Sequence, residues 1–321
     1  MKNVLVTGGA GFIGSNLINR LIEDPNLKIT CLDNFDPFYN PKVKKENIKP
    51  FLKNPNFNFI QADICNFPKL KSKLTKKFDI IIHLAAKVGI GPSLVDPKIY
   101  TEVNIGGTQN LLEFAKKLKC KQFIFASSSS VYGVNPNVPW REEDSVLMPI
   151  SPYASTKISG ELLGHTYSYL YNARFLGLRF FSVYGPKQRP DLVIHRFTKL
   201  ISEGKAINIY GDGKTKRDYT FIDDVVSGIV AALDYSSSSY EIINLGNNEP
   251  VELRELIRIL EKVLGKKAVI NKLPERPGDA PFTFADISKA QRILNYQPRT
   301  SLFDGLQKYI SWFKGQNEKS K

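Results

Sequence analysis

Short apolar runs rich in β-branched residues recur through the first half of the chain, and amphipathic helical patterns separate them. Six such runs occur before residue 185, at residues 3–7, 28–32, 56–61, 80–84, 122–127 and 173–179. This alternation predicts an α/β fold in which helices cover both faces of a parallel sheet. The runs are almost continuously apolar, as expected of strands that are buried on both faces.

The second half of the chain differs in composition and in its pattern of apolar residues. A seventh apolar run at residues 240–245 returns after a helix-like segment at 223–233. Other stretches are rich in proline and glycine and hold short amphipathic helices, such as 253–264. The polar tail, residues 315–321, is expected to fray.

A chain of 321 residues is longer than one hydrophobic core usually organises, which favours two parts. We expect a doubly wound, Rossmann-like domain at residues 1–184, to which residues 217–245 return. The remaining residues, 185–216 and 246–321, are expected to form a smaller, interleaved substrate lobe.

The net charge of +14 would suit a nucleic-acid partner, but the lysines are dispersed and no known nucleic-acid module accompanies them. We therefore interpret them as a solvated surface and predict no nucleic-acid partner. No apolar run approaches the ~20 residues that span a bilayer, so no membrane association is predicted. The first strand begins almost at Met1, which leaves no room for a signal peptide.

The numbers and spacing of the cysteines and histidines bear on disulfide bonds, metal sites and catalytic triads. Cys31, Cys65 and Cys120 are odd in number and widely spaced, which predicts a reduced, cytoplasmic protein without disulfide bonds. The three histidines are also far apart. We therefore predict no metal site and no Ser/His/Asp triad, and we expect His83 to be structural.

A glycine-rich turn follows the first strand and opens a helix. Gly8 permits the tight turn, Gly11 lets the backbone approach a pyrophosphate, and Gly14 lets the helix pack closely on the sheet. The helix N-terminus then offers free N–H groups to the anion. Asp33 closes the second strand at about the spacing (~20 residues) at which an acidic residue binds the adenosine ribose. Because that carboxylate repels a 2′-phosphate, the pattern predicts NAD rather than NADP.

Other positions at the ends of the first four strands are expected to contact the same cofactor. Asp63 and Ile64 follow the third strand, where they can hold the adenine edge, and small residues after His83 let the dinucleotide lie close. In addition to the glycines and Asp33, the predicted NAD contacts are Phe12, Ile13, Asn34, Asp63, Ile64, Leu84, Ala85, Ala86, Lys87, Asn104, Tyr153 and Lys157.

A tyrosine and a lysine provide the candidate catalytic groups. Tyr153 and Lys157 are four residues apart, which places them on one face of a helix. The ammonium group is expected to lower the pKa of the tyrosine, so that the phenolate can take a proton from a substrate alcohol. Upstream, Ser128, Ser129 and Ser130 follow the fifth strand. Ligands of open α/β sheets bind at such carboxyl ends.

Five motifs together resemble the extended short-chain dehydrogenases/reductases of the NAD-dependent epimerase/dehydratase family. They are TGGAGFIG (7–14), HLAA (83–86), SSSSVYG (127–133), YASTK (153–157) and RDYTFIDD (217–224). Four further stretches are most similar to UDP-glucuronate 4-epimerases: DNFDPFY (33–39), FFSVYGP (180–186), QRPD (188–191) and PGDAPFT (277–283). The resemblance covers nearly the whole chain.

The resemblance implies roles for individual residues. Ser128 bridges the substrate and Tyr153, and Lys157 binds the nicotinamide ribose. Arg217 and Arg276 hold the nucleotide diphosphate, and Asp279 binds the uridine ribose. Together with Ser128, the remaining predicted substrate contacts are Ser129, Ser130, Ser182 and Arg189.

The resemblance implies 4-epimerisation of a UDP-sugar through a transient 4-keto sugar. Among such reactions it favours the conversion of UDP-glucuronate to UDP-galacturonate. Ser182 stands where UDP-glucose 4-epimerases usually have asparagine, whereas Gly91 stands where many glucuronate epimerases have arginine. The alternatives are a UDP-glucose or UDP-N-acetylglucosamine 4-epimerase and, more remotely, a non-catalytic NAD-sensing protein. The family also implies a homodimer formed by helices at 104–117 and 152–169.

Overall fold

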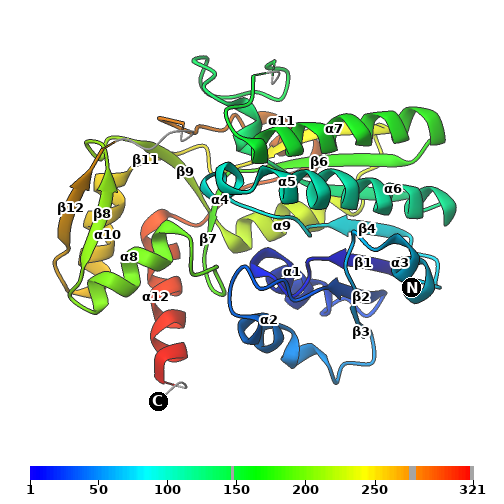
Figure 1. The fold of residues 1–321 in the computed structure, drawn as a ribbon, viewed down its shortest axis with the longest axis horizontal. Helices are drawn as coiled ribbons and strands as arrows, with labels where there is room; N and C mark the ends of the chain where they lie inside the picture. The colour runs from blue at the N-terminus through cyan, green and yellow to red at the C-terminus, as the bar shows by residue number, and fades with distance from the viewer. Residues whose placement is uncertain (146–147, 275–279, 319–321) are drawn as a thin grey trace.

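The computed structural model describes residues 1–145, 148–274 and 280–318. Within them, seven parallel strands form the main sheet in the order β10-β6-β5-β4-β1-β2-β3 (Figure 1). The strands are β1 (Lys2–Thr7), β2 (Leu27–Asp33), β3 (Phe57–Gln61), β4 (Ile80–His83), β5 (Gln122–Ser128), β6 (Arg174–Phe180) and β10 (Tyr240–Leu245). The predicted Rossmann-like fold class is confirmed.

Alternate residues of each strand face two separate hydrophobic cores. In β1, Val4 and Val6 join the core beneath helices α1 (Phe12–Leu21) and α9 (Ile222–Ala232), while Leu5 joins the core on the other face. Helices cover that second face: α3 (Phe67–Lys73), α6 (Gly107–Lys117) and α7 (Pro152–Tyr171). Short helices α2 (Pro41–Ile48), α4 (Ile90–Val95) and α5 (Pro97–Tyr100) belong to the connections, and α11 (Ser288–Leu294) packs near β10.

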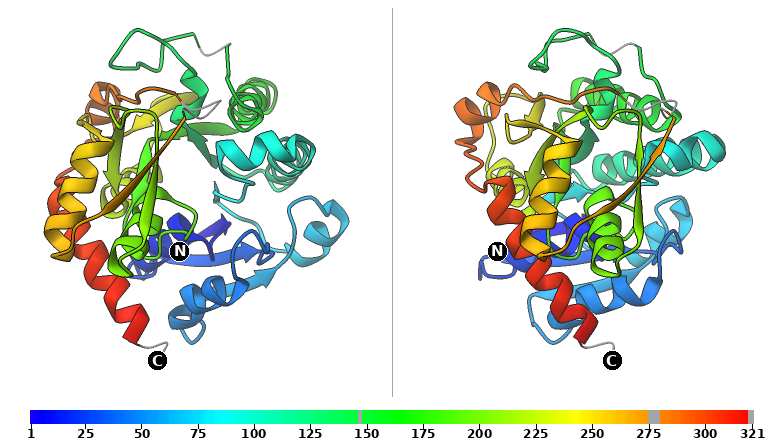
Figure 2. Two further views of the ribbon diagram at one scale, coloured as in Figure 1. Left: turned by 60° about the vertical axis from the view of Figure 1, so that its left-hand side comes forward. Right: turned by 90° about the vertical axis from the view of Figure 1, so that its left-hand side faces the viewer.

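The smaller lobe lies beside the main sheet (Figures 1 and 2). It contains the sheet β11-β9-β7 and the strand pair β12-β8. Its elements are β7 (Ser182–Tyr184), α8 (Val193–Ser202), β8 (Ala206–Tyr210), β9 (Lys216–Phe221), β11 (Pro250–Glu252), α10 (Leu253–Leu264), β12 (Val269–Leu273) and α12 (Leu302–Glu318). β7 and nearly all of β9 belong to the segments predicted for the Rossmann-like domain, but they pair with each other outside the main sheet. The predicted division of the chain stays a proposal.

Two local features differ from the sequence-based expectations. Helix α12 runs on to Glu318, so the expected fraying does not begin at Gly315. Buried residues three to four positions apart, including Leu306, Tyr309 and Phe313, hold this helix against the lobe. A π-helical segment, Thr101–Gly106, precedes α6 where an ordinary helix from Asn104 was expected. No helix of the described residues is long and apolar enough to span a membrane.

Candidate functional site

A cavity of about 880 Å³ opens at the carboxyl ends of the main-sheet strands. It lies where the strand order reverses between β1 and β4, which is where open α/β sheets bind their ligands. Its volume falls within the range that holds small-molecule ligands and cofactors. The glycine turn lines one part of it, and residues of the smaller lobe line another. A ligand can therefore contact both parts of the molecule at once.

The glycine turn is too closely packed for larger residues. Gly8 has a φ of +69°, and a Cβ there would lie 2.7 Å from the backbone nitrogen of Ala85. A Cβ on Gly14 would lie 2.6 Å from the Cα of Gly9. No side chain caps the N-terminus of α1, whose N-cap residue is Gly11. The first-turn N–H groups are therefore available for an anion, as a dinucleotide pyrophosphate requires.

Asp33 lies at the end of β2, buried and at the edge of the cavity. Its carboxylate accepts hydrogen bonds from the backbone N–H groups of Ala10 (3.1 Å) and Phe35 (2.8 Å). Burial raises the pKa of Asp33, while nearby Lys44 and these two hydrogen bonds lower it. Next to it, the amide of Asn34 donates to Asp63 at 2.9 Å. These groups form a polar rim suited to a ribose and an adenine.

The predicted cofactor residues gather around this cavity with one exception. Lining it are Gly8, Gly11, Phe12, Ile13, Gly14, Asp33, Asn34, Asp63, Ile64, Leu84, Ala85, Ala86, Lys87, Tyr153 and Lys157. Asn104 is buried behind the cavity instead. It accepts a hydrogen bond from the backbone N–H of Lys87 (2.8 Å) and donates to the Lys87 carbonyl and the Thr156 hydroxyl (3.0 Å each). Asn104 thus ties the loop after β4 to helix α7.

A salt bridge spans the cavity rim between two loops that flank the glycine turn. Lys87, after β4, lies 2.8 Å from a carboxylate oxygen of Asp36, after β2. The pair is only about a quarter exposed. Lys44 secures the same loop by donating to the carbonyl of Asp36 at 2.9 Å. Because β1 lies between β4 and β2, this bridge crosses the space next to the glycine turn.

The three predicted catalytic residues meet at the same cavity. Ser128 ends β5, and Tyr153 and Lys157 lie on α7. The Lys157 ammonium group lies 5.8 Å from the centre of the Tyr153 ring and donates to the Ala126 carbonyl at 2.7 Å. Ser128 at the end of β5 and the pair Tyr153 and Lys157 on α7 therefore belong to one site.

The pKa of Tyr153 does not follow the sequence-based expectation. Burial raises the pKa of its hydroxyl, and the Ser128 hydroxyl and the Arg189 guanidinium oppose that rise. Burial also lowers the pKa of Lys157 to about 8, with Glu161 acting in the opposite direction. The expected lowering of the Tyr153 pKa is therefore wrong. Burial, which raises this pKa, outweighs the groups that lower it.

The predicted substrate residues that the structure describes line the same cavity. Ser128, Ser129, Ser130, Ser182, Arg189 and Arg217 line it. Arg276 and Asp279 lie outside the described residues. The Arg189 guanidinium makes two hydrogen bonds of 2.9 Å to Asp191 and lies 5.9 Å from the centre of the Phe38 ring. A substrate carboxylate at Arg189 would share the guanidinium with Asp191.

Several lining residues are missing from the sequence-based prediction of the site. Asp36, Phe38 and Tyr39 come from the loop after β2, and Lys44 comes from α2. The DNFDPFY stretch contains three of them, so its resemblance to the family was a usable signal. Lys44 is one lysine of a lysine-rich chain, and only its buried position distinguishes it.

His83 lies behind the site in a buried position. Its ring nitrogens are hydrogen-bonded to the hydroxyls of Thr7 (2.8 Å) and Thr108 (3.0 Å). Burial, followed by the charge of Lys157, lowers the pKa of His83 to about 3, so the ring is neutral. Within the described part of the chain, no group of three histidine, cysteine or acidic residues is arranged to hold a metal.

Comparisons with known proteins agree with this geometry. Residues 4–246 match the model of the NAD dependent epimerase/dehydratase family. A UDP-glucuronate 4-epimerase of Thermodesulfobacterium geofontis is 42% identical over 98% of this chain and 97% of its own length.

Two solved structures are also similar. A UDP-glucuronic acid 4-epimerase from Bacillus cereus, in complex with UDP-glucuronic acid and NAD, is 40% identical, covers 98% of this chain and 99% of its own, and superposes with a TM-score of 0.91. A UDP-glucose 4-epimerase of Thermotoga maritima with UDP-glucose is 31% identical over 98% of this chain and 99% of its own, with a TM-score of 0.89.

Proposed function

Because this chain belongs to the NAD dependent epimerase/dehydratase family, we propose that it converts UDP-glucuronate to UDP-galacturonate by inverting C4 of the sugar. The predicted family, enzyme class and NAD dependence are confirmed by this membership and by the relatives. One observation carries the proposal: Ser128, Tyr153 and Lys157 meet in the cavity that the glycine turn and Asp33 also line.

In this function Tyr153 acts as the base. Its phenolate takes the proton of the sugar 4-hydroxyl, directly or through Ser128, and later returns a proton to the same oxygen. When bound, NAD would supply reversible hydride acceptance at C4 of the sugar. Lys157 holds the nicotinamide ribose. Its pKa of about 8 leaves the ammonium form mainly present at neutral pH.

The cofactor fits the residues that are present. Gly8 packs closely on the backbone of Ala85 and Gly14 on that of Gly9, and this packing leaves the uncapped N-terminus of α1 at the cavity, where a pyrophosphate can bind. Asp33 and Asn34 are assigned to the adenosine ribose, and Asp63 and Ile64 to the adenine. Lys87 and the small residues before it are assigned to the centre of the dinucleotide, and Asn104 to the positioning of Lys87.

The substrate carboxylate is assigned to the serine-rich side of the cavity. Ser129 and Ser130 follow Ser128, and Ser182 begins β7 nearby on the cavity lining. Together with Arg189 they offer hydrogen-bond donors that suit a carboxylate. Arg217 is assigned to the diphosphate, and Arg276 and Asp279, outside the described residues, to the diphosphate and the uridine ribose.

The test is to incubate the purified protein with UDP-glucuronate and with UDP-glucose separately and to resolve the products by proton NMR. We expect kcat/KM to be higher for UDP-glucuronate, because a hydroxymethyl group uses the carboxylate donors less fully. A preference for UDP-glucose would overturn the substrate assignment but leave the epimerase assignment standing. Tyr153→Phe serves as the inactive control that excludes a contaminating epimerase.

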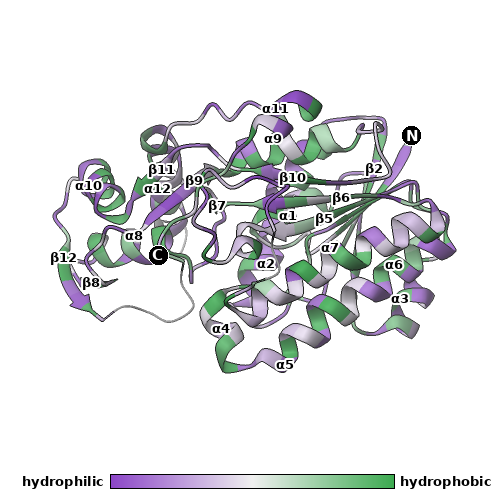
Figure 3. Cartoon of the chain, turned by 90° about the horizontal axis from the view of Figure 1, so that it is seen from above, coloured by the Kyte–Doolittle hydropathy of each residue, from purple (hydrophilic) through white to green (hydrophobic). Residues whose placement is uncertain are grey.

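We further propose a homodimer formed by α6 and α7. The two helices lie side by side, and hydrophobic residues alternate with polar ones along both (Figure 3). On α7, Leu162 is 59% exposed and Tyr169 is 82% exposed, seven residues apart and so on one face. A second copy would cover them. Light scattering at micromolar concentration should give twice the chain mass, and Leu162→Glu should give a monomer.

A cytoplasmic location is also proposed. Cys31, Cys65 and Cys120 are all free, and two of them are buried, which suits a reducing compartment. Fractionation of cells that express the tagged protein should place it with cytoplasmic markers, and recovery from a secreted fraction would contradict the assignment.

A further inference from the structure

The backbone that carries the cavity serines is held at both ends by buried side chains. At one end, the Ser127 hydroxyl donates to Glu161 on α7. At the other end, the Tyr132 hydroxyl donates to the Asn244 side-chain oxygen on β10 at 2.7 Å. Glu161, Tyr132 and Asn244 do not line the cavity. Tyr132 and Asn244 therefore act on a ligand only through the segment that Ser127 and Tyr132 bound, residues 128–131, whereas Glu161 also raises the pKa of Lys157.

Arg179 joins the two ends. Its guanidinium makes a two-point contact with Glu161, with hydrogen bonds of 2.9 and 2.8 Å, and the pair is almost fully buried. The same guanidinium lies 4.7 Å from the centre of the Tyr132 ring. Trp140 also stacks on that ring at 5.0 Å. Because Tyr132 is fixed in this way, loss of its hydroxyl alone would leave its ring in place.

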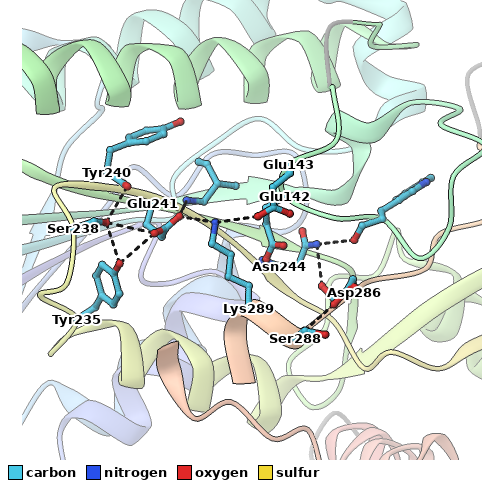
Figure 4. A network of polar contacts seen from close by, with 12 residues as sticks. Glu142, Glu143, Tyr235, Ser238, Tyr240, Glu241, Asn244, Asp286, Ser288 and Lys289 are labelled. Atoms are coloured by element: carbon cyan, nitrogen blue, oxygen red, sulfur yellow. Dashed lines mark hydrogen bonds and ion pairs between the residues drawn. The ribbon is translucent and has the colours of Figure 1, made fainter. Parts of the chain in front are cut away.

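Asn244 ties the far end of the segment to two other parts of the chain (Figure 4). Its side-chain nitrogen donates to the carbonyls of Trp140 (3.0 Å) and Asp286 (3.1 Å). Its backbone N–H donates to a carboxylate oxygen of Glu142 at 2.7 Å. Asn244 is fully buried, so each of these bonds replaces one that water would otherwise provide.

We propose that Tyr132 and Asn244 are positioning residues that hold Ser129 and Ser130 against the substrate carboxylate. This inference rests on the proposed function. In the 4-keto intermediate the carboxylate is β to a ketone, so it can leave as CO2. The C5–C6 bond then breaks, its electron pair becomes an enolate on the C4 oxygen, and a proton adds at C5. A carboxylate held by fixed serine hydroxyls stays out of the orientation that this step requires.

The test compares Tyr132→Phe with Tyr296→Phe. Tyr296 is also buried, and its hydroxyl makes one hydrogen bond, to the Gly246 carbonyl at 2.9 Å, but it does not line the cavity. Both variants lose one buried hydroxyl contact, and melting curves with NAD check that both are folded. Proton NMR then measures the ratio of decarboxylated UDP-pentose products to UDP-galacturonate.

We expect Tyr132→Phe to raise this ratio about tenfold and to lower kcat/KM more for UDP-glucuronate than for UDP-glucose, which has no carboxylate. Tyr296→Phe should stay within about twofold of the wild-type ratio, which is what a merely structural role predicts for both variants. Equal ratios in the two variants would overturn the positioning role. If the wild-type protein does not turn over UDP-glucuronate, the proposed function fails and this inference fails with it.

Discussion

Replacing Gly14 with alanine tests whether dinucleotide binding requires the close packing of α1 on the glycine turn. The new Cβ would lie within 3.0 Å of three backbone atoms of Gly8 and Gly9. Backbone atoms cannot rotate away as the end of a side chain can. The turn cannot move toward β4 either, because Gly8 is already packed against the backbone of Ala85. The N-terminus of α1 must therefore shift away from the turn.

The size of the effect follows from that shift. Overpacking of this kind costs about 1–3 kcal/mol in stability. Ordinary carbon contacts are about 3.5 Å, so a gap of 2.6 Å must widen by roughly 1 Å. That movement is enough to break a hydrogen bond from an α1 N–H group to a phosphate oxygen, and a bond to a charged group contributes about 1.5–3 kcal/mol. The Kd for NAD should rise by roughly 10–100-fold.

The assay is calorimetric titration with NAD, accompanied by thermal melts. Gly315→Ala is the matched control, because a Cβ on Gly315 in α12 meets nothing within 4 Å. It should leave NAD affinity unchanged and stabilise the helix by up to ~1 kcal/mol. If Gly14→Ala binds NAD within twofold of wild type while folded, the requirement for this close packing is refuted.

Four further predictions concern single side chains. Tyr153→Phe should lower turnover by about 10²–10⁴-fold while calorimetry shows nearly unchanged UDP affinity. Asp33→Ala should reduce the ratio of NADP to NAD dissociation constants, because no carboxylate then faces the 2′-phosphate; an unchanged ratio would move the discrimination to another residue. Burial lowers the pKa of Lys157 from 10.5 to about 8, so the unfolded state binds more protons between these values. The stability of wild type relative to Lys157→Met, from urea melts, should therefore rise with pH from about 8 to 10.5, and a flat difference would contradict this. Lys87→Gln removes the bridge to Asp36 and should speed NAD release several-fold in stopped-flow fluorescence, whereas an unchanged rate would show that the bridge does not retain the cofactor.

The main sheet could be predicted because its strands are buried on both faces and therefore read as continuous apolar runs. The run at 240–245 coincides with β10, and the others agree with the observed strands to within one or two residues. The glycine turn and the tyrosine-lysine pair could be predicted because their chemistry depends on spacing along one element. Short strands such as β7 and β11 have too few residues for such a pattern.

Partnerships between distant residues could not be predicted in this way. The Lys87–Asp36 bridge and the Arg179–Glu161 pair depend on which strands and helices are neighbours. The direction of the Tyr153 pKa depends on burial, which a four-residue spacing does not report. The sequence shows which residues these are, but not which groups surround them in the folded protein.

The position of β10 at the edge of the main sheet has a consequence for synthesis on the ribosome. Its neighbour β6 ends at Phe180, but β10 begins only at Tyr240. At ~5–20 residues per second, roughly 3–12 s pass between the two strands. During this interval the nascent chain exposes the hydrogen-bonding edge of β6, which invites pairing with other chains. Slow elongation through residues 181–239 would thus favour aggregation, and a chaperone that covers this edge would favour a high yield.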